Sequence, residues 1–162
     1  MSIEGGDSRT LQVIRRVLGL LLLVAWVGTF VELLLLGHDE DGLQLIPLAL
    51  LVSGVVTLMW TLFRPATSAV AAFRIVMVLM IVGGGLGVAL HFRANLEFQR
   101  ELTPDGPMSD LFWKAVLAKT PPALAPGVLA QLGCLGLIYA YRLPAGRTAA
   151  DRHEGESNVA IR

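Results

Sequence analysis

Residues 17–36 constrain this chain more than any other stretch. The run reads VLGLLLLVAWVGTFVELLLL and carries a single charged residue, Glu32. A helix of about 20 residues, rising about 1.5 Å per residue, matches the roughly 30 Å hydrocarbon core of a bilayer. The run is too long for the apolar part of a cleaved signal peptide, and the GHDEDG that follows offers no small-residue cleavage site. It therefore predicts a membrane anchor that is not removed.

Three further apolar runs follow, at residues 44–63, 70–92 and 123–141. Only 16% of the chain is charged and 54% is hydrophobic, with a mean hydropathy of +0.65, whereas soluble domains have about 25% charged residues. We therefore predict an all-α integral membrane protein, with a four-transmembrane-helix bundle in residues 17–142. Four spans leave no room for a separate soluble domain.

One long loop, residues 93–122, separates the third and fourth runs. Its first part continues the helical spacing of the third run, and Pro104 and Pro107 then break it. Ser109 is predicted to cap a short amphipathic helix over residues 110–119, which would lie at the membrane interface. We expect its Phe112 and Trp113 to dock either on the membrane or on the outer mouth of the bundle, over Glu32.

The distribution of basic residues predicts the orientation. Of the 13 Lys and Arg residues, four lie in the long loop. The other nine are three in residues 1–16, Arg64 and Arg74 in and next to the second linker, and four from residue 142 onward. Because cytoplasmic segments carry the excess of Lys and Arg, both termini are predicted to be cytoplasmic, as in a bacterial inner-membrane protein. The polar tail, residues 143–162, is expected to be disordered.

Glu32 is the first candidate for chemistry, because an ionisable residue within a span is costly and is often functional. It is predicted to exchange a proton with a substrate, with Gln131 as a second polar candidate. Two alternatives stay open for Glu32: it reaches the outer headgroup layer, or it pairs with Arg93 or His91. The mid-span Ser53, Thr57 and Gln131 are also expected to hydrogen-bond to backbone or to one another between helices.

A second candidate site is an outer-face cluster of imidazoles and carboxylates, which are ligands for Zn²⁺ or another divalent ion. The alternative interpretation is a solvated acidic turn that reinforces the orientation, because no HExxH, HxxxH or paired-cysteine spacing is present. The candidate ligands are His38, Asp39, Glu40, Asp41, His91 and Glu97.

Small residues recur at helical spacing in the third and fourth runs. Gly83 and Gly87 form a GxxxG pattern, and Gly136 with Ala140 repeats the spacing. Such residues let transmembrane helices approach closely. The pattern predicts packing within the bundle, with homodimerisation or a flexible substrate-accommodating point as alternatives.

The number of spans and the loop style resemble those of many small four-span inner-membrane proteins of bacteria. Glu32 in the first span resembles the membrane glutamate of the small multidrug resistance transporters, whose chains are shorter with short loops throughout. We hold three hypotheses: an accessory protein that packs against itself or a larger complex, a proton-coupled transporter using Glu32, and a metal-binding sensor using His38 and His91. No catalytic constellation, cofactor motif or nucleic-acid signature is present in the sequence, so an enzyme is not expected, and the expected partners are lipid and protein.

Overall fold

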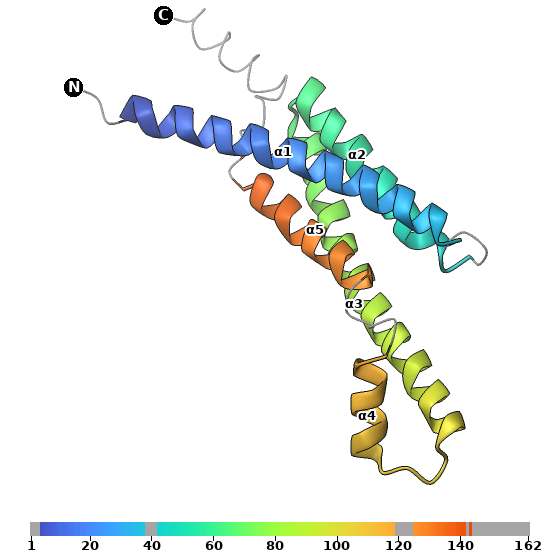
Figure 1. Ribbon diagram of the computed structural model, residues 1–162. Helices are drawn as coiled ribbons and strands as arrows, with labels where there is room; N and C mark the ends of the chain where they lie inside the picture. Colours follow the sequence, from blue (N-terminus) through green and yellow to red (C-terminus); the bar gives the residue numbers. More distant parts are fainter. Residues whose placement is uncertain (1–3, 38–41, 119–124, 142, 144–162) are drawn as a thin grey trace, which may run out of the picture.

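A computed structural model describes residues 4–37, 42–118, 125–141 and 143. Every secondary-structure element in these ranges is a helix (Figure 1), which confirms the all-α prediction. Among the residues outside this description are the acidic turn at 38–41, the end of the long loop with the first two residues of the fourth run at 119–124, and the tail from 144 onward. The helices are α1 (Glu4–Leu35), α2 (Leu45–Phe63), α3 (Thr67–Leu102), α4 (Met108–Val116) and α5 (Ala125–Tyr139).

Three of these helices, α1, α2 and α3, are long and apolar enough to cross a membrane. Helix α5 has 15 residues and is therefore only about 22 Å long, shorter than the predicted fourth span. Large apolar side chains also cover the outward faces of the three long helices, as a lipid-facing surface requires. Examples that are about half exposed or more are Leu20, Leu21, Val24, Val52, Val56, Val78, Leu79 and Val82.

The helix ends agree in part with the sequence signals. Helix α1 ends where Gly37 takes a left-handed φ of 66°, a conformation that glycine adopts without strain. Helix α2 carries Pro47 in its first turn, where a missing N–H costs little, and ends before Arg64 and Pro65. The predicted cap Ser109 is wrong: the N-cap is Pro107, with an extended ψ of 141°, so α4 starts earlier and Ser109 lies inside it.

Two helices extend well beyond their predicted spans. Helix α1 begins at Glu4 and helix α3 continues to Leu102, because no proline interrupts either segment. In the extension of α3, Arg93 Nε donates to Glu97 Oε1 at 2.8 Å, an i,i+4 pair that supports helix. At about 1.5 Å per residue, the 36 residues of α3 form a rod about 54 Å long.

Helix α3 organises the fold. It packs against α2, α4 and α5, while α1 packs across α2 and α5. Figure 1 shows α5 alongside the middle of α3, and α4 folded back beside the far end of α3, beyond the other helices. The molecule therefore consists of a bundle of α1, α2, α3 and α5 and a projecting α3–α4 hairpin, residues 93–116.

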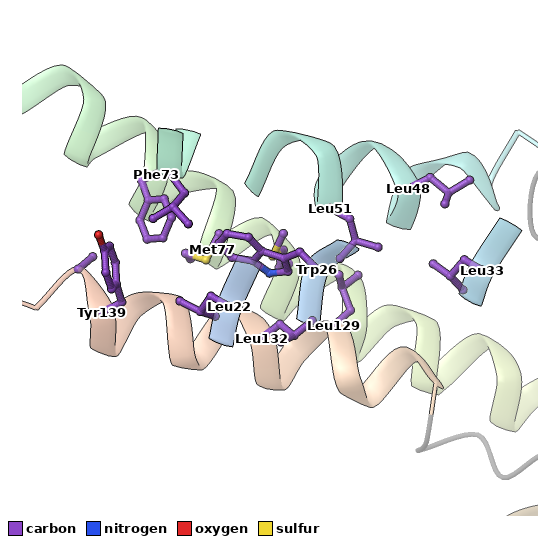
Figure 2. Close-up of a cluster of buried hydrophobic side chains, with 13 residues drawn as sticks. Leu22, Trp26, Leu33, Leu48, Leu51, Phe73, Met77, Leu129, Leu132 and Tyr139 are labelled. Carbon is purple, nitrogen blue, oxygen red and sulfur yellow. The ribbon is translucent and has the colours of Figure 1, made fainter. Parts of the chain in front are cut away.

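One hydrophobic core joins α1, α2, α3 and α5. Figure 2 shows Trp26 at its centre, with Phe73 and Tyr139 at one end and Leu33 and Leu48 at the other. The ring centroids of Trp26 and Phe73 lie 6.1 Å apart, and those of Phe73 and Tyr139 lie 5.7 Å apart, both within the range of favourable aromatic pairs.

Glycines set the distance between α3 and α5. A Cβ on Gly84 would lie 2.6 Å from the Ala130 nitrogen, and one on Gly133 would lie 2.6 Å from the Met77 oxygen. Backbone therefore meets backbone along this seam, as small residues allow in membrane helices. The sequence pattern did not select Gly84 or Gly133, because a GxxxG spacing identifies candidate faces but not which face a neighbour covers.

The four predicted packing residues also lie at contacts between helices. A Cβ on Gly87 would meet Pro126 at 2.8 Å, one on Gly83 would meet Leu50 at 3.1 Å, and one on Gly136 would overlap the Met77 sulfur. Ala140 is fully buried. These positions are occupied by packing within one chain.

Candidate functional site

A cavity of about 400 Å³ opens at one end of the bundle, which we call the His91 pocket. All four bundle helices contribute to its walls, together with Leu36 and the residues that lead into α2. Its lining is mainly apolar and consists of Thr29, Leu33, Leu36, Leu43, Gln44, Ile46, Pro47, Gly83, Leu86, Gly87, Leu90, His91, Pro126 and Leu129.

The local sequence explains why space remains there. Gly83 and Gly87 line the pocket from α3 but have no side chains to fill it. Helix α5 starts at Ala125, and its Pro126 already packs against Gly87. The next turn of α3, which carries Leu90 and His91, therefore lies past the first turn of α5.

The structure does not bring the two proton or substrate candidates into this pocket. Glu32 lies near the end of α1 with an exposed side chain, and Gln131 is exposed on α5. Neither residue lines the cavity. Arg93, one proposed partner of Glu32, is paired with Glu97 instead. The proton role of Glu32 and Gln131 stays a prediction.

The polar residues inside α2 hydrogen-bond to their own helix, as expected for Ser53 and Thr57. The Ser53 hydroxyl donates to the Ala49 carbonyl at 2.7 Å, and the Thr57 hydroxyl donates to the Ser53 carbonyl at 2.7 Å. Thr61 donates to the Leu58 carbonyl in the same way. Hydroxyls bound to the backbone of one helix do not form a polar path between helices.

The metal candidates fall into separate places. His38, Asp39, Glu40 and Asp41 lie outside the described residues. His91 is exposed and lines the pocket, whereas Glu97 lies on the projecting part of α3 and binds Arg93; this hydrogen bond raises the pKa of Arg93. Among the residues that the structure describes, no group of three or more His, Cys, Asp or Glu is placed to hold a metal ion.

Two arginines hold the C-terminal end of α5 at the opposite end of the bundle, which we call the arginine end. Arg74 of α3 donates to the Ala140 carbonyl at 2.9 Å, and Arg15 of α1 donates to the Tyr141 carbonyl at 3.1 Å. The last carbonyls of a helix have no partners within it and carry partial negative charge, so guanidinium groups stabilise them. No sequence signal predicts these bonds, which join residues 66 and 126 positions apart.

The α3–α4 hairpin is a third feature. Asn95 Nδ2 donates to the Ala115 carbonyl at 3.3 Å, and the rings of Phe92 and Phe112 meet edge to face at 5.3 Å. Leu111 and Ala115 are buried, while Trp113 is 61% exposed and Leu117 is 76% exposed. The helix thus has one face on α3 and one open apolar face.

This position corrects the prediction that α4 docks over Glu32. Helix α4 packs on α3, and Figure 1 shows it beside the far end of α3, away from the C-terminal end of α1. The edge-to-face contact of Phe112 on α4 with Phe92 on α3, just before the hairpin, explains the difference, because it holds α4 against α3. The alternative prediction, docking on the membrane, is untouched by this contact.

The described part of the molecule thus offers three features for function: an apolar pocket, an arginine end that fixes α5, and an amphipathic hairpin. None of them presents an arrangement of reactive groups that identifies a reaction. Comparisons with known protein families, with curated proteins and with solved structures find no match, so function is inferred from the residues and the geometry alone.

Proposed function

We propose that this chain is an accessory membrane protein of a bacterial inner membrane, and that its α3–α4 hairpin binds a partner protein. It crosses the bilayer four times, with both termini in the cytoplasm and the hairpin on the outer face. The observation that carries the proposal is the hairpin itself, which projects beyond the bundle (Figure 1). Its exposed Trp113 and Leu117 leave an apolar face open.

The arginine end supports the topology. Arg15 of α1, Arg74 of α3 and the C-terminal end of α5 meet at one level. With the basic N-terminal segment in the cytoplasm, α5 must then end on the cytoplasmic side as well.

Helix length supports the position of the hairpin. If Arg74 marks the inner boundary, a hydrocarbon core of about 30 Å accommodates about 20 further residues of α3. The helix then leaves the core near Phe92, and the segment from Arg93 to Leu102 continues about 15 Å beyond it. Residues Arg93, Glu97 and Arg100 make this segment polar, as an aqueous position requires.

The other two hypotheses receive less support. Neither Glu32 nor Gln131 lines the pocket. The structure therefore offers no common site for these two residues on a proton-coupled transport path. His91 and Glu97 lie on different parts of α3, one at the pocket and one paired with Arg93. The small-residue positions that a homodimer would use are occupied inside one chain.

The proposal is tested by purifying tagged full-length protein from its native membrane in mild detergent and measuring the particle mass and composition. We expect a partner at fixed stoichiometry. The double substitution Trp113→Ser and Leu117→Ser should release this partner, because it makes the open face of α4 polar. Lys114→Ala, on the same helix, is the matched control and should keep it.

Two results would contradict the proposal. One is a monomer or homodimer with no stoichiometric partner under conditions that keep other membrane complexes intact. The other is full retention of the partner by the double variant, which would place the contact elsewhere on the molecule. Circular dichroism of each variant confirms that the helices are intact.

A further inference from the structure

The His91 pocket has the size of a small-molecule site. Its volume of about 400 Å³ lies within the range of about 300–1,000 Å³ that ligand pockets occupy.

The rim of the pocket is continuous with the apolar outer surface of the bundle. Leu36, Leu43 and Leu86 line the cavity and are also among the most exposed apolar side chains of the molecule. The floor is different, because Leu33 and Leu129 line the same cavity while being almost fully buried. The space thus leads from the lipid-facing surface into the core.

The polar lining residues lie mostly at one end of this space. Gln44 precedes α2, and His91 is the last α3 residue of the lining, so both stand at the end farthest from the arginine end. Thr29 lies deeper, on α1. The site is thus apolar along its length and polar where it meets the end of the bundle, which matches an amphiphile with one hydrocarbon chain.

From these observations we propose that the His91 pocket binds one acyl chain of a membrane phospholipid, with the ester region near Gln44 and His91. The inference rests on the membrane placement in the proposed function but not on the partner of the hairpin. Gly83 and Gly87 then have a second role: they form part of the wall of this site as well as allowing helices to approach.

The test uses full-length protein in vesicles of phosphatidylethanolamine and phosphatidylglycerol that contain a small fraction of phospholipid with a diazirine on its acyl chain. After illumination, the labelled residues are mapped by mass spectrometry. We expect labels on Leu33 and Leu129, which are only 9% and 5% exposed. Lipid that merely surrounds the protein cannot reach them.

Matched substitutions separate the pocket from the general lipid surface. Thr29→Phe places a ring in the cavity and should lower the labelling of Leu33 and Leu129 several-fold, whereas Val31→Phe, on the same helix but outside the lining, should not. Leu86→Trp and Val82→Trp form a second pair, since the parent side chains are 62% and 60% exposed and only Leu86 lines the pocket.

Each outcome has a distinct meaning. Labels confined to exposed residues such as Leu79 and Val82, with none on Leu33 or Leu129, would overturn the acyl-chain site and leave the membrane placement intact. Equal labelling in both members of each variant pair would overturn it as well. No label on any apolar helix would refute the membrane placement and with it the proposed function. The Trp113→Ser, Leu117→Ser variant should keep the buried labels, because the site does not depend on the hairpin.

Discussion

The two ends of the bundle use the same helices in different ways. At the arginine end, α3 carries Phe73 and Met77, which are completely buried against α1 and α5. At the other end, α3 carries Gly83 and Gly87, and a cavity of about 400 Å³ remains. The comparison shows that side-chain volume on one helix decides where the bundle is solid and where it is open.

The neighbouring glycines of α3 face different surroundings. At Gly84 the backbone of α5 occupies the place of a side chain. At Gly83 and Gly87 the side chains of Leu50 and Pro126 lie close to the corresponding place, although both glycines also line the pocket. Gly85 faces outward, and apart from its chain neighbours and the nearby backbone of its own helix no atom of the described residues lies within 4 Å of the place that a Cβ would take there. A single run of glycines thus provides a tight seam, part of a pocket wall and an outward-facing surface.

The largest expected effect comes from filling the seam. We expect Gly84→Leu to lower the free energy of unfolding by more than about 4 kcal/mol, a size reserved for severe core disruption. Its Cβ alone would lie 2.6 Å from backbone, so α3 and α5 must separate. The neighbouring Gly85→Leu is the control and should be neutral or slightly stabilising, because leucine favours helix. Unfolding in mixed micelles, followed by circular dichroism, measures both; equal losses would disprove the seam.

The next effect concerns the hydrophobic core of the bundle. Trp26 is fully buried, so Trp26→Ala should cost about 3–4 kcal/mol by leaving a cavity. Its Nε1 has no hydrogen-bond partner among the described residues, so Trp26→Phe, which removes that donor and keeps a ring, should cost much less. Trp60→Ala, at a 42% exposed position, serves as the control in the same unfolding assay. A Trp26→Phe loss as large as that of Trp26→Ala would show that the indole nitrogen is satisfied after all.

The arginine end should show an intermediate effect. Arg74→Ala removes the donor to the Ala140 carbonyl and is expected to cost about 2 kcal/mol, typical of a hydrogen bond from a charged group. Arg15→Ala should cost less, because its bond to the Tyr141 carbonyl is longer and exposed. Amide hydrogen exchange at the last turn of α5 measures the loosening. Arg16→Ala, at an exposed position, is the control and should leave amide exchange in α5 unchanged. If it accelerated exchange as much as Arg74→Ala, the effect would come from the lost positive charge and not from the lost hydrogen bond to the helix end.

The smallest effect belongs to the hairpin. Asn95→Ala removes the donor to the Ala115 carbonyl and should cost about 1 kcal/mol, within the usual range for a neutral hydrogen bond. We expect faster amide exchange in α4 and no change in the bundle core, because the bond lies outside the bundle. Glu101→Ala, an exposed change on the same arm, is the control. Destabilisation of the core by Asn95→Ala would show that hairpin and bundle are coupled.

Local patterns in the sequence determined much of this protein. Apolar runs of sufficient length predict the membrane helices, Arg64 with Pro65 ends α2, and the i,i+4 spacing of Arg93 and Glu97 predicts the extension of α3. Such signals involve residues within a turn or two of one another, so they can be read without knowing the fold. The misplaced start of α4 is a local error of this kind, because the helix begins after Pro107 and not after Ser109.

Tertiary structure alone decided the rest. The bonds of Arg15 and Arg74 to the end of α5, the choice of Gly84 for the seam and the His91 pocket all depend on residues far apart in the chain. Hydrophobic periodicity identifies the apolar face of an amphipathic helix. A helix that is apolar on all sides has no such signal, so its sequence does not show which side meets which neighbouring helix. The packing of the other helices around α3 settles that choice.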